Sequence, residues 1–277
     1  MTSPAKKKTA VADAMKKHHT SERRACRALN LNRSGLRYMP VLLPEDGELT
    51  NKIIELATNY GRYGYRKITR MVNNLGYNVN HKKVERIWRE QGLRVPKRQQ
   101  KKRRLFLNDG SCIRLRAEHK NHVWSYDFVY DELSNHRSIR WLNIIDEYTR
   151  ECLFTMPAKI WRNGMIIEVL SALFMKRGVP EYIRSDNGPE FIAKKLKEWI
   201  HSVGVQTAYI EPGSPWENGY CESFNSKMRD EFLNETVFDT LKEAKLLTKE
   251  WMQEYNTLRP HGSIGYMTPA AYQVIAA

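Results

Sequence analysis

Two acidic residues in the second half of the chain restrict its possible folds more than any other feature. The first, Asp186, stands in IRSDNGPEF (residues 183–191), where an apolar run leads into the turn-forming sequence SDNG. A strand that ends at this turn would hold the Asp186 carboxylate at the edge of a sheet. The second, Glu222, follows after 35 intervening residues, in SPWENGYCESFNSKMRD (residues 214–230), where helical spacing resumes. The chain therefore needs a fold that combines a sheet edge with a helix.

A third carboxylate, that of Asp127, lies in VWSYDFVY (residues 123–130), a run of aromatic and β-branched residues that predicts a central strand. Mg²⁺ takes oxygen ligands and is typically held by one or two carboxylates together with substrate phosphates. Two such ions activate the attacking oxygen and stabilise the leaving oxygen of a phosphoryl displacement, without a nucleophilic side chain. Three carboxylates on two strands and a helix are therefore candidate ligands of hard divalent cations.

Other acidic residues compete for these positions. Asp146 and Glu147 lie near the end of a predicted strand, but their place in a predicted hairpin turn favours a structural role. Glu217 is the rival of Glu222, although it stands in a loop rich in proline and glycine.

Four segments together resemble the transposases of bacterial insertion sequences, which are related to retroviral integrases: WSYDF, IRSDNGPEF, CESFN and YNTLRPHGSIGYMTPAAY. The resemblance covers nearly the whole chain and is strongest for the product of the second reading frame of two-frame elements. It implies an α/β protein with an RNase H-like catalytic core, in which helices flank a mixed five-stranded sheet, preceded by an all-α helix-turn-helix region. It also implies that Asp127, Asp186 and Glu222 are a catalytic DDE triad that binds two Mg²⁺ ions, with Mn²⁺ able to substitute.

The activity implied by this resemblance is DNA cleavage and strand transfer, in which a freed 3′-hydroxyl at the element's end attacks a second phosphodiester. The implied partners are the element's terminal inverted repeats, target DNA, further copies of the chain, and the first-frame product, separate or fused. Two alternatives stay open. One is an RNase H-like nuclease that cuts without joining, and the other is a DNA-binding regulator derived from such an element.

The charge balance agrees with a polyanionic partner. The chain has 46 Lys and Arg residues against 31 Asp and Glu residues, a net charge of +15, and phosphate contacts made by such an excess drive binding by counterion release. Its four cysteines are far apart and form no CxxC pair, which predicts neither a disulfide framework nor a zinc site. With no apolar run long enough for a membrane span, we expect a cytoplasmic bacterial protein that associates with the nucleoid when bound to DNA.

Composition predicts four parts. Residues 1–19 are lysine-rich with little to bury and predict a disordered basic arm. Residues 20–93 predict helical pairs of helix-turn-helix type, the first capped by Thr20. Residues 94–115 predict a basic linker that few contacts cross. Residues 116–277 predict the catalytic domain, with a helical tail that packs over the helix carrying Glu222.

Strand and helix signals place the elements of the catalytic domain. Strands are expected at residues 121–130, 140–145, 150–156 and 206–210, with a further strand leading to Asp186, and helices at residues 163–176, 190–203 and 240–255.

Several polar side chains are candidate DNA contacts. They lie on a candidate recognition helix, in the basic linker, beside Asp186 and on the Glu222 helix: Lys82, Lys83, Arg86, Lys101, Lys102, Arg103, Arg104, Asn187, Lys227 and Arg229. Arg229 lies seven residues, or about two turns, after Glu222 and so faces the same way. The alternative for Arg229 is a surface ion pair with Asp230 or Glu231. We interpret His261 as structural or phosphate-contacting.

Overall fold

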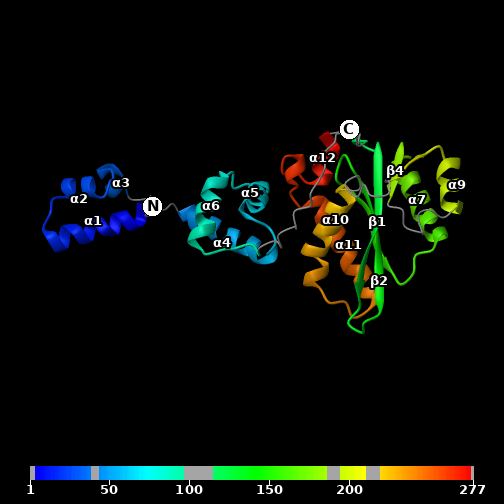
Figure 1. Ribbon diagram of the computed structural model, residues 1–277, viewed down its shortest axis with the longest axis horizontal. Coiled ribbons are helices and arrows are strands. Elements are labelled where there is room, and N and C mark those ends of the chain that lie inside the picture. Colours follow the sequence, from blue (N-terminus) through cyan, green and yellow to red (C-terminus); the bar gives the residue numbers. More distant parts are fainter. Residues whose placement is uncertain (1–3, 39–43, 97–114, 186–193, 210–218, 276–277) are drawn as a thin grey trace, which may run out of the picture. The chain divides into compact units, whose positions relative to one another are not determined.

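The computed structural model describes residues 4–38, 44–96, 115–185, 194–209 and 219–275. The chain divides into two compact units, Met1–Asn51 and Lys52–Ala277. Figure 1 labels their helices and strands.

The first unit begins with a helix where the sequence predicted a disordered arm. Its helices are α1 (Pro4–His18), α2 (Glu22–Ala28) and α3 (Arg33–Arg37). The prediction is wrong for residues 4–18 because Val11 gives α1 an apolar side, which packs in one cluster with Ala25 and Cys26. The cap of α2 is Ser21, whose side chain accepts a hydrogen bond from the Arg24 N–H group, and not Thr20.

Three further helices precede the basic segment: α4 (Pro44–Asn59), α5 (Tyr65–Asn74) and α6 (His81–Glu90). Ile68 and Val72 of α5 and Val84 of α6 are fully buried, as expected for the core of a helical pair. Gly76 adopts a left-handed backbone (φ 97°) just after α5, where the helix ends. Leu75, the C-cap residue of α5, is exposed.

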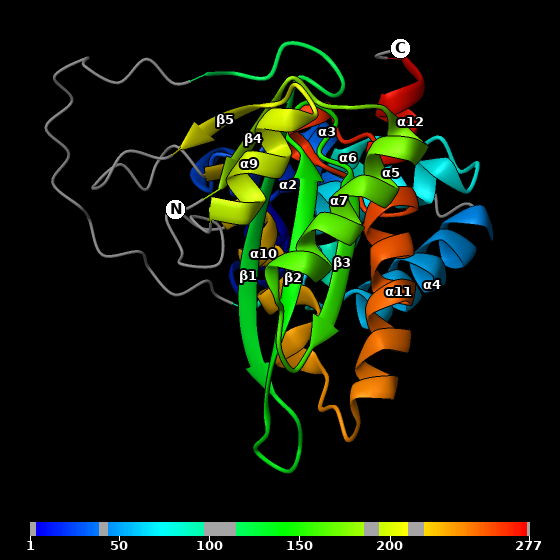
Figure 2. The same ribbon diagram turned by 90° about the vertical axis from the view of Figure 1, so that its right-hand side faces the viewer.

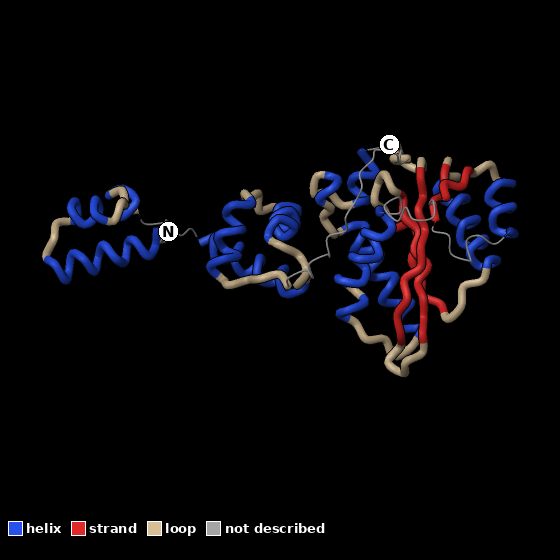
Figure 3. The backbone as a smooth tube through the Cα atoms, viewed as in Figure 1, coloured by secondary structure: helices blue, strands red, loops and turns tan. Residues whose placement is uncertain are grey.

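The catalytic part contains the predicted mixed five-stranded sheet (Figure 3). Its strands are β1 (Val123–Glu132), β2 (Ser138–Asp146), β3 (Cys152–Ala158), β4 (Tyr182–Ser185) and β5 (Gln206–Tyr209). The order across the sheet is β3-β2-β1-β4-β5. Strands β1, β2 and β3 are antiparallel neighbours, whereas β4 runs parallel to both β1 and β5. The sheet therefore brings the end of β4 beside the middle of β1.

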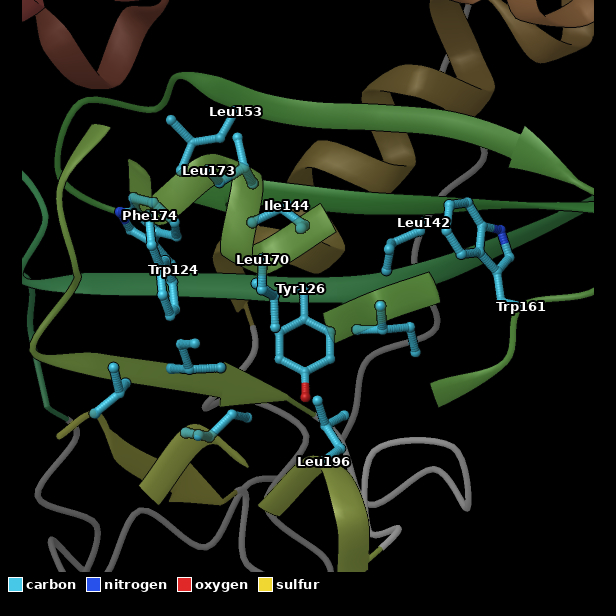
Figure 4. Close-up of a cluster of buried hydrophobic side chains, with 14 of the residues drawn as sticks. Trp124, Tyr126, Leu142, Ile144, Leu153, Trp161, Leu170, Leu173, Phe174 and Leu196 are labelled. Atoms are coloured by element: carbon cyan, nitrogen blue, oxygen red, sulfur yellow. The ribbon is translucent and has the colours of Figure 1, made fainter. Parts of the chain in front are cut away.

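One face of the sheet is covered by α7 (Asn163–Arg177) and α9 (Lys194–Ser202); Figure 2 looks onto this face. Trp124, Tyr126 and Phe128 alternate along β1 and belong to the cluster on this face. Figure 4 shows Trp124 and Tyr126 among side chains of the covering helices. This layer is an apolar core.

The other face carries the remaining elements, which are α10 (Gly219–Glu231), η2 (Leu233–Glu235), α11 (Leu241–Thr257), η3 (Gly262–Ile264) and α12 (Pro269–Ile275). The rings of Phe224 in α10 and Tyr255 in α11 lie 4.9 Å apart, edge to face. This contact confirms that the C-terminal part packs over the helix carrying Glu222. Two thiols, Cys152 and Cys221, are fully buried in this layer, and burial raises the pKa of the Cys152 thiol well above its ordinary value.

The division of the chain differs from the predicted one. The sequence predicted the main boundary at residues 94–115, whereas the two compact units meet between Asn51 and Lys52. The physical reason is a set of ion pairs between residues on either side of the basic segment. Lys67 of α5 lies 3.2 Å from Glu231 of α10, and Arg62 lies 3.4 Å from Asp230. In the part of the chain that the structure describes, no helix has the length and apolar character needed to cross a bilayer.

Candidate active site

Asp127 lies in the middle of β1, half-buried, on the face covered by α10. Its side chain points away from the α7 layer because its neighbours Tyr126 and Phe128 belong to that layer. Asp127 Oδ2 accepts a hydrogen bond of 2.8 Å from Nδ2 of Asn225 in α10, and Oδ1 accepts one of 2.7 Å from the Phe128 N–H group. The carboxylate is therefore held by a strand and by a helix.

A row of polar side chains fixes the orientation of Asn225. Asp127, Asn143 and Thr155 are register partners across β1, β2 and β3. The Thr155 hydroxyl donates to Asn143 Oδ1 (2.7 Å), and Asn143 Nδ2 donates to Asn225 Oδ1 (2.9 Å). Because each amide uses its oxygen as an acceptor in this chain, the Nδ2 group of Asn225 is left to face Asp127.

Glu222 lies three residues before Asn225, so the two side chains occupy the same side of α10 about one turn apart. The Asn225–Asp127 hydrogen bond therefore places the Glu222 side of α10 toward β1. Glu222 is exposed and stands in the first turn of the helix, where the macrodipole favours a negative charge. Both carboxylates offer the hard oxygen ligands that Mg²⁺ prefers.

Several predicted site residues lie outside the described residues: Asp186, Asn187, Lys101, Lys102, Arg103 and Arg104, together with the alternative ligand Glu217. Their assigned roles stay predictions.

Asp146 and Glu147, the alternatives to Asp127, are both structural. Asp146 accepts hydrogen bonds of 2.8 and 2.9 Å from the N–H groups of Tyr148 and Thr149 and so closes the turn after β2. Glu147 accepts two hydrogen bonds, of 2.6 and 2.7 Å, from the Arg184 guanidinium in β4. Both partners of this ion pair are buried, at 0% and 3% side-chain exposure.

Arg229 does not pair with its acidic neighbours. Its Nη2 donates a 2.6 Å hydrogen bond to the Tyr130 carbonyl of β1. Asp230 pairs with Arg62, and Glu231 pairs with other cations. The alternative of a surface ion pair with Asp230 or Glu231 is therefore wrong. The contact with Tyr130 instead fastens the C-terminal half of α10 to β1.

The predicted recognition helix presents cations outward. Lys82 and Arg86 are exposed on α6, while Val84, Ile87 and Trp88 form its buried side. Arg86 Nε lies 3.8 Å from Glu90, an exposed pair of little energetic consequence. Lys82 and Arg86 thus face solvent, and their contact with DNA stays a prediction.

Sequence reasoning missed two features. The first is the polar row through Asn143, which stands as the one polar residue within the apolar run WLNII. The second is the buried ion pair of Arg259 with Glu231. Burial alone would raise the Glu231 pKa, but the hydrogen bond and charge of Arg259 outweigh it and lower the pKa overall. The one-turn spacing from Glu222 to Asn225 is a sequence signal that puts both side chains on one side of a helix, whereas the contact with Asp127 is defined only by the fold.

A second group of possible ligands lies just before β1 and β4. One ligand atom each of His119, His122 and Glu181 lies within 4.8 Å of the other two. The Glu118 N–H group donates to His122 Nδ1 at 3.0 Å, so the neutral ring of His122 carries its proton on Nε2. Nε2 is the atom nearest Glu181, at 3.8 Å. His122 therefore presents a hydrogen to the carboxylate, and not a lone pair to a cation.

A mixed sheet of this order, with an aspartate on its central strand held against a helix that carries a glutamate, is typical of polynucleotidyl transferases of the integrase class. Residues 117–215 and 203–269 match family models described as "Integrase core domain", and residues 44–102 match one described as "HTH-like domain". A chain of the simian T-cell lymphotropic virus intasome shares the fold, with a TM-score of 0.50 and 15% identity over 80% of this chain and 74% of that chain.

Insertion-element proteins are similar over nearly the full length. A 39.2 kDa protein of element IS476 from Xanthomonas euvesicatoria is 37% identical over 97% of this chain and 77% of its own length. A 31.7 kDa protein of element IS407 from Burkholderia multivorans is 38% identical over 92% of this chain and 91% of its own. The transposase of element IS904 from Lactococcus lactis is 24% identical over 77% of this chain. The chain belongs to this family of insertion-element transposases, DDE-type enzymes that bind DNA and use divalent metal.

Proposed function

We propose that the protein catalyses Mg²⁺-dependent cleavage at the ends of an insertion element and the transfer of the cut strand to target DNA, with Asp127, Asp186 and Glu222 as the catalytic triad. The hydrogen bond from Asn225 to Asp127 carries this proposal. It joins the strand that bears one candidate ligand to the helix that bears another.

The register of β4 supports the inclusion of Asp186. Ser125 of β1 is the register partner of Arg184 in β4, and both side chains bond to Glu147, so they lie on the same face of the sheet. Asp127 follows Ser125 by two residues, and Asp186 follows Arg184 by two residues. An extended chain at this point would set both aspartates side by side on the α10 face, because strand side chains alternate.

The chemistry of the ligands also fits. Asp127 and Asp186 would hold one ion, and Asp127 and Glu222 the other. Bound Mg²⁺ would supply an activated water or 3′-hydroxyl and would stabilise the leaving oxygen. Asn225 and the Phe128 N–H group keep the Asp127 carboxylate in one orientation. Glu222, being exposed, is open to the DNA.

DNA binding is proposed to involve the cations of α6, the basic segment and α10. Lys82, Lys83 and Arg86 would contact DNA from α6, Lys101, Lys102, Arg103 and Arg104 from the basic segment, Asn187 from beside Asp186, and Lys227 and Arg229 from α10. Several copies would hold two element ends together on nucleoid DNA in the cytoplasm, with the first-frame product as a separate or fused partner. Mn²⁺ would replace Mg²⁺ in this reaction.

A strand-transfer assay tests the proposal. The wild-type protein, a labelled duplex ending in a pre-cut 3′-hydroxyl, an intact target duplex and Mg²⁺ should give a joined product. Asp186→Asn should remove both cleavage and joining while leaving DNA affinity intact, because the basic surface is unchanged. Cleavage without joining would identify a nuclease. DNA binding with no metal-dependent chemistry in the wild type would identify a regulator.

A further inference from the structure

A cavity of about 560 Å³ lies against α10 on the side away from the catalytic carboxylates. Gly219, Tyr220 and Ser223, which flank Glu222 in the sequence, form part of its wall. Arg62 and Lys67 line it from the helical region, and residues of the C-terminal part complete it. The cavity therefore joins the first turn of the catalytic helix to segments from both ends of the second unit.

The lining is strongly cationic. Five cations face it, Arg62, Lys67, Arg150, Lys227 and Arg259, against the two carboxylates of Asp230 and Glu231. Both carboxylates are already engaged. Asp230 lies 3.4 Å from Arg62, and Glu231 is shared by Lys67 and Arg259. The positive charge of the cavity is thus only partly neutralised by the protein itself.

Lys227 has no carboxylate within ion-pair distance anywhere in the described chain. Its side chain lies in the cavity wall, half-buried. Burial, followed by the charge of Arg259, lowers its pKa to about 8. A partly buried ammonium group without an anionic partner is unfavourable, and an anion in the cavity would remove that penalty.

Arg150 gives an independent indication. It occupies the turn between β2 and β3 with φ 65°, a left-handed backbone that is uncommon for arginine and costs about 1 kcal/mol or more. Its guanidinium carbon lies 3.7 Å from the centre of the Tyr220 ring in the cavity wall. Its buried Nε has no hydrogen-bond partner among the described residues. The strained turn thus leaves an unsatisfied buried donor on a residue that lines the cavity.

His261 is a third unsatisfied group. It is 2% exposed, lines the same cavity, and its Nε2 has no hydrogen-bond partner within the described ranges. Burial and then the charge of Arg259 lower its pKa to about 2, so the ring is neutral in the free protein. An anion that offsets the surrounding charges would favour its protonated form, in which both ring nitrogens donate.

We propose that this cavity binds a phosphate group of the DNA backbone, with Lys227 and Arg150 as donors and His261 behind them. A phosphate accepts several hydrogen bonds from converging cations, and such bonds are among the strong ones in proteins. The choice of DNA as the source of the phosphate rests on the proposed function. Since the wall includes the neighbours of Glu222, this phosphate would fix the position of the strand relative to the catalytic helix.

A phosphate-replacement scan tests the proposal in the full chain. Duplexes carrying the element's terminal repeat, each with one phosphate replaced by uncharged methylphosphonate, are titrated with wild type, Lys227→Met and Lys245→Met. One position should weaken wild-type binding about tenfold yet leave Lys227→Met binding unaffected, because the two groups contact each other. Lys245, exposed on α11 and outside the cavity, is the charge-matched control and should give the wild-type profile.

Thermal unfolding with inorganic phosphate, against chloride at equal ionic strength, provides the second measurement. Phosphate should raise the Tm of wild type but not of Lys227→Met, whose own Tm without phosphate should be slightly higher than that of wild type. Arg150→Asn keeps a residue that tolerates the left-handed turn and should lose the same phosphate response. A lost phosphate response in both variants cannot be attributed to a folding defect of one of them.

The outcomes separate the two proposals. If no position in the scan couples to Lys227 and inorganic phosphate has no effect, the cavity is not a phosphate site. If inorganic phosphate acts through Lys227 while no DNA position does, the ligand is free phosphate and the DNA assignment is overturned. If coupling is found but wild type fails to join strands, the cavity proposal stands and the proposed function fails.

Discussion

The two faces of the sheet differ in the kinds of side chain that they bury. The face under α7 and α9 is an apolar layer in which aromatic side chains of β1 pack against the helices. The face under α10 and α11 also has an apolar layer, but it buries hydrogen-bonded and charged groups as well, including Asn143 and the Glu147–Arg184 pair. Strand β1 serves both faces, because alternate residues point to opposite sides.

The comparison separates what holds this fold together from what its chemistry requires. Apolar burial is non-directional and tolerates adjustment, whereas buried polar groups must meet specific partners or destabilise the protein. The buried polar groups of the α10 face need such partners, and their hydrogen bonds hold Asp127 in one orientation. Substitutions on the two faces should therefore differ in kind: those on the α7 face should reduce stability, and those on the α10 face should also reduce activity.

The largest effect is expected at the carboxylates themselves. Asp127→Asn and Glu222→Gln should each lower the rate of strand transfer at least about a thousandfold, since roughly 4 kcal/mol of transition-state stabilisation by metal is lost. Unfolding free energy and DNA affinity should change little. Strand transfer assays with anisotropy binding on the same preparations measure both, and retained joining in either variant would remove that residue from the triad.

Breaking the buried ion pair should show how severely the α10 face depends on its polar partners. Arg184→Met leaves the Glu147 carboxylate buried without its cation and should lower the free energy of unfolding by about 3–5 kcal/mol. Urea denaturation measures this. The double variant Arg184→Met/Glu147→Gln should recover part of the loss. If the single variant were as stable as wild type, the stability of this face would not depend on its polar partners.

The α7 face supplies the matched apolar test. Leu170→Ala removes a side chain that is 1% exposed and should destabilise the protein by about 3 kcal/mol through lost burial and the cavity that remains. Activity per folded molecule, measured well below the melting temperature, should be unchanged. A loss of strand transfer that exceeds the unfolded fraction would contradict the separation of the two faces.

The hydrogen bond between Asn225 and Asp127 should give an intermediate effect. Asn225→Ala frees the Asp127 carboxylate and should reduce metal affinity and activity by about 10–100-fold, with a stability loss of about 1–2 kcal/mol. Activity is measured as a function of Mg²⁺ concentration, so that a shifted metal requirement is distinguished from a lower maximal rate. Ser226→Ala, at an exposed neighbouring position of α10, is the control and should behave as wild type.

The smallest effect is a pH dependence at Lys227. Its pKa in the folded protein is about 8 instead of 10.5. Below pH 8 the lysine is charged in both states and the folded state bears the burial penalty. Between pH 8 and 10.5 the folded protein releases this proton first, so wild-type stability rises relative to Lys227→Met. At pH 7 the variant should be about 1 kcal/mol more stable, and urea unfolding should show the difference in unfolding free energy narrowing by pH 10.

Much of the fold was accessible from the sequence because its signals are local. Alternation predicted β1, β2 and β3 to within two or three residues, and apolar spacing predicted α7 and α11. Helix α1 was not predicted because its lysine-rich composition conceals the few residues that it buries, and Val11 becomes apolar core only when α2 lies beside it. The composition of a segment says nothing about the elements that pack against it, whereas the burial of its side chains depends on them.

The candidate site was predictable in its ligands and not in their support. Asp127 and Glu222 were found by motif, and the structure brings their strand and helix together. Asn143 interrupts an apolar run and Thr155 does not stand out in sequence, but the role of both depends on cross-strand register, which only the folded sheet defines. The same holds for Arg150, whose contact with Tyr220 joins residues 70 positions apart in the chain.

Cys221 directly precedes Glu222 and is fully buried on the inner side of α10. A thiol reagent can reach it only when this helix lifts from the sheet or when the whole protein unfolds. In a Cys26→Ala/Cys112→Ala/Cys152→Ala background, the rate at which Cys221 is alkylated therefore reports how often the helix opens. No probe has to be attached near the carboxylates for this measurement.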